Sequence, residues 1–379
     1  MTKLWRAGIS TIIDGCITRA PEKGTVIKMA RVGIIGFAHG HVFAFGDRWQ
    51  KQPELDASIV CGWDHDGQRG EEGCAKLGAR YVSDINAMLR DESIDSVVIS
   101  CETSLHADYV EMAAAARKRI ICYKPVALTL RQADRIVEAV DKYGVPFSMG
   151  WQMRADRQNI KIKELLDSGA FGKIYTIRRR HGLATQKMAN FENLWHASPE
   201  YNRDIFADDA AHPMDFIYWL MGMPETVTAE FATMENPKIP NDNGIALLRY
   251  AGGAIAEVSC NFVCLAAENT VEVYCEKGTI LLSYGDVPST AVPHDLNGLK
   301  WILDGDRDWT YSNIPSPVSH GERIAGQAEA LAGFLNGRRA PVATAQEARD
   351  ALILVLACYV SNREGRRVAV DELDKIYLV

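Results

Sequence analysis

The chain has 379 residues, of which 47% are hydrophobic and 24% are charged, and its formal net charge at pH 7 is -7. This length and composition are typical of a globular protein with about two domains, and the acidic balance argues against nucleic acid as the main partner. No segment approaches the ~20 consecutive apolar residues that a membrane-spanning helix needs, so we expect no membrane partner either.

Residues 1–28 precede the first clear strand and do not fit the pattern of a secretory signal. Asp14 interrupts the only apolar run of this segment, whereas a signal peptide needs a continuous apolar core. We expect Met29 to be the natural start and residues 1–28 to be an N-terminal extension. A mitochondrial targeting peptide is the alternative, which Asp14 and Glu22 disfavour.

The nine cysteines include no CxxC pair, and several of them lie within apolar runs such as SVVISC and RIICYKP. Cysteines of this kind are typical of small buried hydrophobic residues in a reducing compartment. We therefore expect a cytoplasmic protein without a disulfide framework.

Short apolar segments alternate with helix-like segments between residues 30 and 150. This rhythm is typical of βαβ units, in which parallel strands form one sheet with helices on both faces. The pattern predicts an α/β fold with a Rossmann-type, doubly wound parallel sheet over residues 29–150. Strands are expected at 31–36, 57–64, 94–101, 120–125 and 145–151, and helices at 41–52, 67–78, 84–91, 104–119 and 129–144.

The rhythm changes after residue 150, where strand-like pieces follow one another through glycine-rich turns. Residues 151–379 are therefore predicted to form an α+β domain for substrate binding and oligomerisation, with a large, mostly antiparallel open sheet. One open sheet face suggests subunit pairing, and we expect a homodimer or homotetramer. Helices are expected at 156–172, 210–222, 321–337 and 344–365, and strands at 173–182, 226–234, 244–253, 254–264 and 269–285.

The stretch RVGIIGFAHGHVF, residues 31–43, joins the first strand to the first helix, as a dinucleotide-binding turn does. Gly36 supplies the tight turn, while Ala38 and His41 stand where the fingerprint has its other glycines. The helix N-terminus that follows is suited to a pyrophosphate. We predict that the cofactor contacts Gly36, Phe37, Ala38, His39, Gly40 and His41.

Asp64 ends the second strand, 28 residues beyond Gly36, where a carboxylate can accept hydrogen bonds from an adenosine ribose. An anionic group there would repel a 2′-phosphate, and no arginine follows directly in the sequence DHDGQ. We therefore favour NAD over NADP. The pair His39 and His41 could bind zinc from one strand face, but no companion ligand has suitable spacing, and we predict no metal.

Several motifs, in order along both halves of the chain, resemble the Gfo/Idh/MocA dehydrogenases, the relatives of glucose-fructose oxidoreductase and inositol dehydrogenase. Lys124-Pro125 at a strand end is similar to the family's E-K-P motif, with Tyr123 in place of the glutamate. FADDAAHPMDFIYWLMG is similar to its D-x-x-x-H-x-x-D segment, and CEKGTILL to its G-E-K-G-T turn. The resemblance runs from about residue 30 to 371.

This resemblance implies that Lys124, Asp208 and His212 are the catalytic residues. Lys124 could hold the substrate oxygen and assist proton transfer, and partial burial beside another cation would lower its pKa. His212 titrates near neutrality and is the natural acceptor of the hydroxyl proton, while Asp208, four residues earlier, would share its helix face. Asp215 is expected to be structural. Further cofactor contacts are expected from Thr103 and His106, and further substrate contacts from Trp151, Arg154 and His181.

Three functions are compatible with these residues. The first is an NAD(P)-dependent dehydrogenase that transfers a hydride between nicotinamide and a sugar, inositol or related polyol. The second is an NAD-dependent glycosidase that acts by transient oxidation and elimination. The third is a nucleotide-binding regulator without catalysis, although such a protein would not need Lys124, Asp208 and His212.

Overall fold

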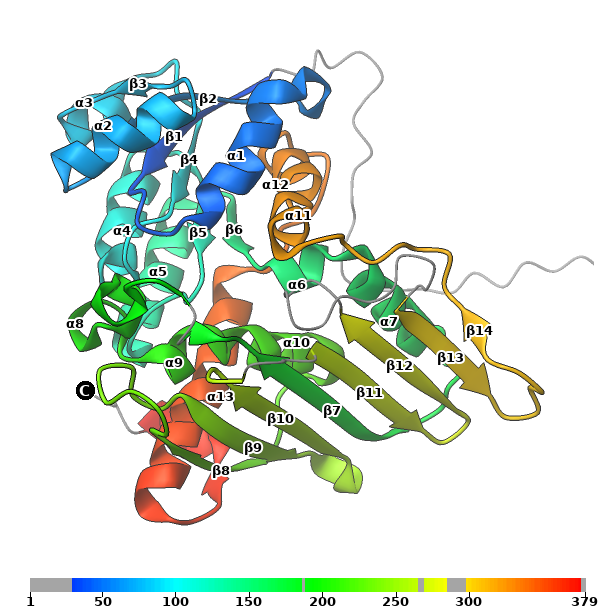
Figure 1. Cartoon of the computed structure of the whole chain (residues 1–379). Helices are drawn as coiled ribbons and strands as arrows, with labels where there is room; N and C mark the ends of the chain where they lie inside the picture. The colour runs from blue at the N-terminus through cyan, green and yellow to red at the C-terminus, as the bar shows by residue number, and fades with distance from the viewer. Residues whose placement is uncertain (1–28, 186–187, 265–268, 285–297, 376–379) are drawn as a thin grey trace, which may run out of the picture.

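The protein is described by a computed structural model over residues 29–185, 188–264, 269–284 and 298–375. The expected extension at residues 1–28 lies outside this part of the chain. Two sheets dominate the fold, and Figure 1 shows them as an upper α/β layer and a lower, broad sheet. The predicted fold class, a Rossmann-type parallel sheet followed by a mostly antiparallel one, is confirmed.

The first sheet has six parallel strands in the order β3-β2-β1-β4-β5-β6. This is the order of a dinucleotide-binding fold, in which the switch point lies between β1 and β4. Most strand residues are buried, because helices cover both faces of the sheet. The strands are β1 (Ala30–Ile35), β2 (Ala57–Trp63), β3 (Arg80–Tyr81), β4 (Ser96–Ile99), β5 (Arg119–Tyr123) and β6 (Phe147–Gly150).

The helices of this domain begin and end at the residues that cap them. Asp84 and Thr129 accept hydrogen bonds from backbone N–H groups of the first turns that follow them, and Gly144 ends its helix in the left-handed conformation. Asp66 caps the helix after β2 in the same way. The helices are α1 (His41–Lys51), α2 (Gly67–Lys76), α3 (Ile85–Arg90), α4 (His106–Ala115) and α5 (Leu130–Tyr143).

The second sheet has nine strands in the order β14-β13-β12-β11-β7-β10-β9-β8-β15. All its neighbours pair antiparallel except β7 and β10, because the chain leaves β7 for several helices before it re-enters the sheet. The strands are β7 (Ile174–Gly182), β8 (Thr226–Ala232), β9 (Asn243–Arg249), β10 (Ile255–Asn261), β11 (Asn269–Cys275), β12 (Gly278–Tyr284), β13 (Leu299–Leu303), β14 (Thr310–Tyr311) and β15 (Val368–Ala369).

One face of this sheet is covered by helices and the other carries exposed apolar side chains. The long helix α13 (Ala345–Glu364) packs on β8, and α10 (Ala211–Met221) packs on β7 and β10. The opposite face presents Ile245, Leu247 and Ile255 to solvent. The shorter helices are α6 (Gln152–Ala155), α7 (Arg157–Asp167), α8 (Pro199–Asn202) and α9 (Ile205–Asp209).

The single helix expected at 321–337 is two helices, α11 (His320–Ala325) and α12 (Ala328–Leu335), separated at Gly326 and Gln327. Apolar residues of α12 join the buried cluster formed by β1, β2 and α1 of the first sheet. The Trp49 indole also donates a hydrogen bond of 2.9 Å to the carbonyl oxygen of Ala328. Figure 1 shows α11 and α12 beside α1. The first domain is therefore completed by a segment from the far end of the chain.

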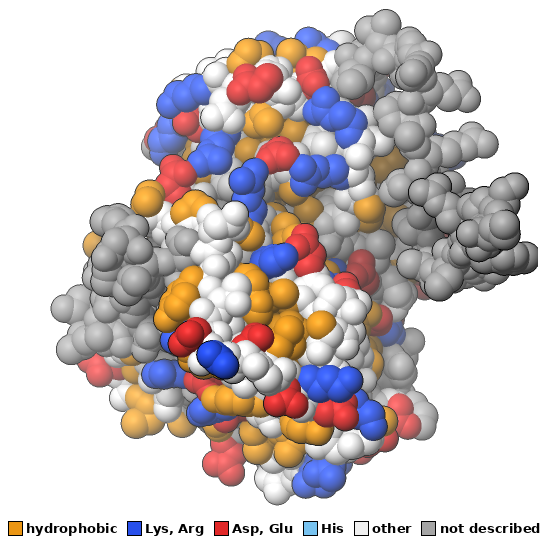
Figure 2. All heavy atoms as spheres, turned by 90° about the vertical axis from the view of Figure 1, so that its right-hand side faces the viewer, with side chains coloured by type: hydrophobic (Ala, Val, Ile, Leu, Met, Phe, Trp, Pro, Cys, Tyr) orange, Lys and Arg blue, Asp and Glu red, His pale blue; other side chains and the backbone are white. Residues whose placement is uncertain are grey.

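On the face drawn in Figure 2, basic and acidic side chains are interspersed with apolar ones. No helix within the described ranges is long and apolar enough to cross a membrane. Eight cysteines of the described chain have free thiols, and most of them are buried.

Candidate active site

Lys124 stands at the end of β5 and points at α9 of the second domain. Its Nζ lies 2.9 Å from Oδ1 of Asp208 and 3.5 Å from Oδ1 of Asp209, and its side chain is only 3% exposed. Burial by itself would lower the pKa of Lys124, but the two carboxylates outweigh it and raise that pKa. The expectation of a lowered pKa is therefore wrong, because a pair of anions, rather than a cation, adjoins the ammonium group.

Asp208 and Asp209 are the last two residues of α9, which the Asp204 side chain caps by accepting from the N–H of Ala207. Asp208 Oδ2 also accepts a hydrogen bond of 2.8 Å from Nδ1 of His196. Burial opposes ionisation of both carboxyls. The charge of Lys124, with His196 beside Asp208, nevertheless keeps the pKa of Asp208 below its usual range.

Asp209 connects Lys124 to two histidines. Its Oδ2 lies 3.0 Å from Nε2 of His181, and its Oδ1 lies 3.9 Å from Nε2 of His212. Burial works against ionisation here too, but His181 and then Lys124 hold the pKa of Asp209 well below its usual value. Asp208 was expected to share a helix face with His212. The helix breaks at Ala210, however, and Asp209 faces His212 instead.

His212 lies in the first turn of α10 with its ring against Trp151, 5.6 Å between ring centroids. Burial, reinforced by the charge of Lys124, keeps the pKa of His212 well below its usual range. Its imidazole is therefore neutral at pH 7 and can accept a proton. Neither His212 Nδ1 nor the Trp151 indole N–H has a hydrogen-bond partner among the described residues, although both atoms are buried.

The loop after β1 is tied to the ends of its neighbouring strands. The Gly36 carbonyl accepts a hydrogen bond from the Ser100 hydroxyl, and the His39 N–H donates to the carbonyl of Ser100. Gly36 has a φ of +83°, and a Cβ there would lie 2.4 Å from Cβ of Cys101. Only glycine fits this approach. Gly40 is the residue before α1, and no side chain caps that helix. The cradle therefore fits a dinucleotide diphosphate at the α1 N-terminus.

The remaining loop residues pack against the first domain and reach the second. The Phe37 ring is buried against Gly62 and Gly73, whose missing side chains make room for it. The Ala38 carbonyl accepts a hydrogen bond of 3.0 Å from the Trp195 indole, which joins this loop to the second domain.

His39 and His41 are buried beside each other, with 4.4 Å between their ring centroids. Burial holds the pKa of each ring well below its usual value. Neither ring nitrogen of His39 has a hydrogen-bond partner in the described chain. Among the described residues, no three His, Cys, Asp or Glu side chains are grouped as metal ligands.

Asp64 lies at the end of β2 and next to this loop, as expected, but its carboxylate is already engaged. Its Oδ2 accepts a hydrogen bond of 2.7 Å from the Phe37 N–H. Arg69, from α2, folds back and makes two hydrogen bonds of 2.8 Å to the same carboxylate. The sequence after Asp64 contains no adjacent arginine, and the fold brings one from five residues away.

Thr103 and His106 lie under the end of β4 and are buried. The Thr103 hydroxyl donates to Oδ1 of Asn202 at 2.7 Å. The two ring nitrogens of His106 approach the carbonyl oxygens of Cys101 and Val126, at 3.2 and 3.3 Å. Burial lowers the pKa of His106, so its neutral ring carries one N–H and can donate to one of these two carbonyls. His106 therefore lies between the loop after β4 and the loop that follows Lys124.

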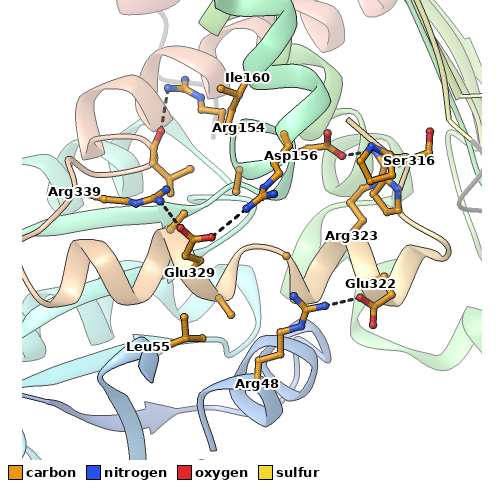
Figure 3. A pocket seen from close by; sticks show the side chains of 18 of the residues that line it. Arg48, Leu55, Arg154, Asp156, Ile160, Ser316, Glu322, Arg323, Glu329 and Arg339 are labelled. Carbon is orange, nitrogen blue, oxygen red and sulfur yellow. Dashed lines mark hydrogen bonds and ion pairs between the residues drawn. The ribbon is translucent and has the colours of Figure 1, made fainter. Parts of the chain in front are cut away.

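Arg154 is not brought to the Lys124 cluster. Its guanidinium makes two hydrogen bonds to Asp215, at 2.9 and 2.8 Å, and one of 2.6 Å to Glu347 of α13. It lines a separate cleft of about 810 Å³ between α1, α7 and α12. Figure 3 shows Arg154 in this cleft, which also holds the ion pairs Arg339–Glu329 and Arg48–Glu322. The expectation of substrate contact is not supported by this position.

Two residues of the cluster were missed from the sequence, namely Asp209 and His196. Asp209 is adjacent to Asp208, and only the position of the helix break decides which of the two faces His212. His196 lies in an irregular segment before α8, where no periodicity marks a buried face. The double acid in FADDAAH was the one available signal, since two neighbouring carboxylates can flank a single cation.

Comparison with known proteins agrees with this architecture. Residues 30–151 match the family model described as oxidoreductase family, NAD-binding Rossmann fold, and residues 159–281 match that of the GFO/IDH/MocA C-terminal domain. The chain belongs to the Gfo/Idh/MocA family. It is a member of an oxidoreductase family whose N-terminal domain is an NAD-binding Rossmann fold.

Relatives match nearly the whole chain at low identity. D-apiose dehydrogenase of Paraburkholderia graminis is 26% identical over 92% of this chain and 92% of its own length. Myo-inositol 2-dehydrogenase of Thermotoga maritima is 24% identical over 90% of this chain and 99% of its own. The structure of levoglucosan dehydrogenase in complex with NADH and levoglucosan shares the fold, with a TM-score of 0.78 and 20% identity, covering 90% of this chain and 99% of the other.

Proposed function

We propose that this member of the family is an NAD-dependent dehydrogenase whose substrate is a sugar, an inositol or a related polyol. The observation that carries the proposal is the Lys124 ammonium held between Asp208 and Asp209, beside the neutral ring of His212. These groups lie beyond the carboxyl end of β5, at the edge of the parallel sheet where ligands bind in such folds. The relatives named for apiose and inositol dehydrogenation support the same substrate class.

Lys124 and His212 divide the handling of the hydroxyl group between them. Because two carboxylates raise the pKa of Lys124, its ammonium group stays charged and donates to the substrate oxygen. Its charge stabilises the alkoxide that forms as the proton leaves. Because the pKa of His212 is lowered, its ring is neutral and accepts that proton. The carboxylates of Asp208 and Asp209 position Lys124, and each has lone pairs left for further substrate hydroxyls.

The bound nicotinamide would supply the acceptor for the hydride. We infer that the diphosphate binds along residues 36–40 at the α1 N-terminus and that Asp64 accepts from the adenosine ribose. Asp64 supports NAD over NADP, since a carboxylate repels a 2′-phosphate. Trp151 and His181 are proposed to line the substrate side, because both adjoin His212, with ring centroids 5.6 and 6.1 Å away.

The test joins a substrate screen to a binding measurement. Wild-type protein is titrated calorimetrically with NAD and with NADP, alongside Asp64→Ala, and then incubated with a polyol panel while NADH is followed. We expect NAD binding that weakens in Asp64→Ala, and NADH formation that His212→Asn reduces by about 10²-fold or more. Sugar release without net NADH would indicate elimination instead, and tight binding without turnover on the whole panel would indicate a regulator.

We also infer that the open face of the nine-stranded sheet pairs with a second subunit. Ile245, Leu247 and Ile255 are exposed there, and exposed apolar side chains on a broad sheet mark association surfaces. Leu247→Glu is expected to lower the sedimentation mass toward that of a monomer. The unpaired thiols of the described cysteines support a reducing compartment, and we propose a cytoplasmic location.

A further inference from the structure

Asp64, the proposed ribose acceptor, has its acceptor sites filled by the protein itself. A carboxylate offers about four lone-pair sites. Oδ2 accepts from the Phe37 N–H at 2.7 Å and from Arg69 Nε at 2.8 Å. Oδ1 accepts from the Asp66 N–H at 2.9 Å and from Arg69 Nη2 at 2.8 Å. A ribose diol can therefore bind Asp64 only if one of these donors leaves.

Arg69 is the donor that is able to leave. The N–H groups of Phe37 and Asp66 belong to backbone that is fixed by the loop and by the start of α2. Arg69 is a side chain with 28% of its surface exposed, whereas the Asp64 side chain is fully buried. The Arg69 guanidinium donates two parallel hydrogen bonds to the two oxygens of the Asp64 carboxylate. A vicinal diol can present two donors to one carboxylate in the same way, so the two groups compete for the same oxygens.

A second carboxylate holds Arg69 from the other side. Nη1 of Arg69 lies 2.8 Å from Oε1 of Glu102, which follows β4. Burial alone would lower the pKa of Arg69. The hydrogen bonds that Arg69 donates to the Asp64 and Glu102 carboxylates outweigh this effect and raise that pKa. His65 lies near both acids, at 3.5 Å from Asp64 and 3.8 Å from Glu102. Arg69 can thus release Asp64 and remain paired with Glu102.

We propose that Arg69 occupies the ribose position of Asp64 and must be displaced onto Glu102 when NAD binds, so that Arg69 sets the affinity and the selectivity for the nicotinamide cofactor. This inference rests on the proposed NAD-dependent function and adds a specificity-determining residue to it. Arg69 competes with the ribose of NAD for Asp64. The same guanidinium provides a positive charge that a 2′-phosphate would meet between the two acids, so it favours NADP relative to NAD.

The experiment measures dissociation constants of the full-length protein for NAD and NADP by calorimetry. Arg69→Ala is expected to bind NAD about tenfold more tightly than wild type, because the ribose no longer competes with a charge-assisted pair. It is expected to bind NADP more weakly, since the phosphate then faces Asp64 and Glu102 without a counter-charge. The exposed Arg90→Ala serves as the control for loss of one positive charge and should leave both constants within twofold.

Glu102→Gln provides a second variant that leaves Arg69 in place. It removes the alternative partner of Arg69, so displacement is harder and NAD should bind more weakly. In the Arg69→Ala background the same change should have no effect on NAD binding, because no arginine remains to be displaced. An effect that persists in that background would mean that Glu102 contacts the cofactor directly, and would overturn the proposal.

The outcomes separate this inference from the function on which it rests. Wild-type protein that binds NAD, with Arg69→Ala binding it equally or more weakly, overturns the role of Arg69 alone. Folded protein that binds neither nucleotide in any variant overturns the proposed function and this inference together. Circular dichroism and thermal melting of each variant establish that the titrated protein is folded.

Discussion

Lys124 and Arg69 each lie between a pair of carboxylates, and they differ in how far each is enclosed. Lys124 lies between Asp208 and Asp209 with 3% of its side chain exposed, and its carboxylates come from the other domain. Arg69 lies between Asp64 and Glu102 with 28% exposed, and all three belong to one domain. The charges are alike, but Lys124 is enclosed between the domains, whereas we propose that Arg69 can release Asp64 and remain paired with Glu102. We infer that exposure and origin, rather than charge, separate a fixed cation at the proposed active site from a displaceable one.

The largest effect that tests this comparison is expected for Lys124→Met. Loss of the ammonium group removes the donor to the substrate oxygen and leaves two anions adjacent in a buried site, so kcat should fall by about 10³-fold. NAD affinity should change by less than threefold, because the adenosine end is untouched. Initial-rate kinetics and calorimetry measure both. Lys161→Met, at a partly exposed position of α7, is the control. A Lys124→Met enzyme that keeps a tenth of its kcat would contradict the assignment.

Arg154 is buried between Asp215 and Glu347, and we propose it as the structural counterpart. Arg154→Met leaves Asp215 buried without its partner and should lower the free energy of unfolding by about 3 kcal/mol. The kcat of the folded protein should stay within twofold of wild type, since Arg154 does not reach the Lys124 cluster. Urea unfolding and kinetics at a temperature below the melting transition check this. Exposed Arg157→Met, in the same cleft, should change stability by less than about 0.5 kcal/mol.

His196 sharpens the comparison, because it acts on the carboxylates rather than on the cation. Its hydrogen bond to Asp208 positions that carboxylate, so His196→Leu should lower kcat by about tenfold with little change in KM. The pKa of Asp208 rises without this bond, which should move the acid limb of the pH–rate profile upward. His196→Asn keeps an N–H donor and should restore part of the rate. Equal losses in both variants, with an unmoved pH profile, would indicate general disruption of the fold.

The smallest effect concerns the histidines at the catalytic end. Burial lowers the pKa of His39, His41 and His212, so below about pH 6.5 the unfolded chain takes up protons that the native state does not. Their contribution to stability is present above pH 6.5 and is lost as the pH falls toward the native pKa values, at about 1.4 kcal/mol per pH unit for each histidine. Unfolding free energies between pH 7 and pH 5 should therefore fall less steeply in His39→Gln than in wild type. Equal slopes would contradict this account.

The sequence predicts most of the fold because its local signals agree with the tertiary structure. The buried strands of the first sheet and the helices bounded by Asp84, Thr129 and Gly144 lie where expected. The segment expected as one strand at 269–285 is instead two antiparallel strands, β11 and β12, because the chain turns between Cys275 and Gly278. The parallel pairing of β7 with β10, and the strands β13 and β14, were not predicted. The β7–β10 pairing and strand β14 do not depend on a local pattern. The first follows from a crossover through several helices, and β14 is only two residues long.

The sequence predicts the residues of the candidate site that follow strands. It predicts only some of the site residues that lie on helices and loops. Lys124 and Asp64 follow buried strands, and such positions converge at one edge of a parallel sheet whatever the loops do. The partners of these residues depend on how helices end and fold back, as with Asp209 and Arg69. The direction of the Lys124 pKa shift could not be inferred, because it depends on two carboxylates that are 84 and 85 residues away in the chain.

The position of α12 has a consequence for the order in which the molecule is built. Residues 328–335 supply part of the apolar cover of β1 and α1, although they come almost 300 residues later in the chain. During synthesis the first sheet emerges with this side uncovered, and it stays so until nearly the whole chain has left the ribosome. A fragment cut at residue 150 would expose the Trp49 indole and its neighbours to solvent. The last part of the chain to be made therefore completes the apolar cluster of the first part.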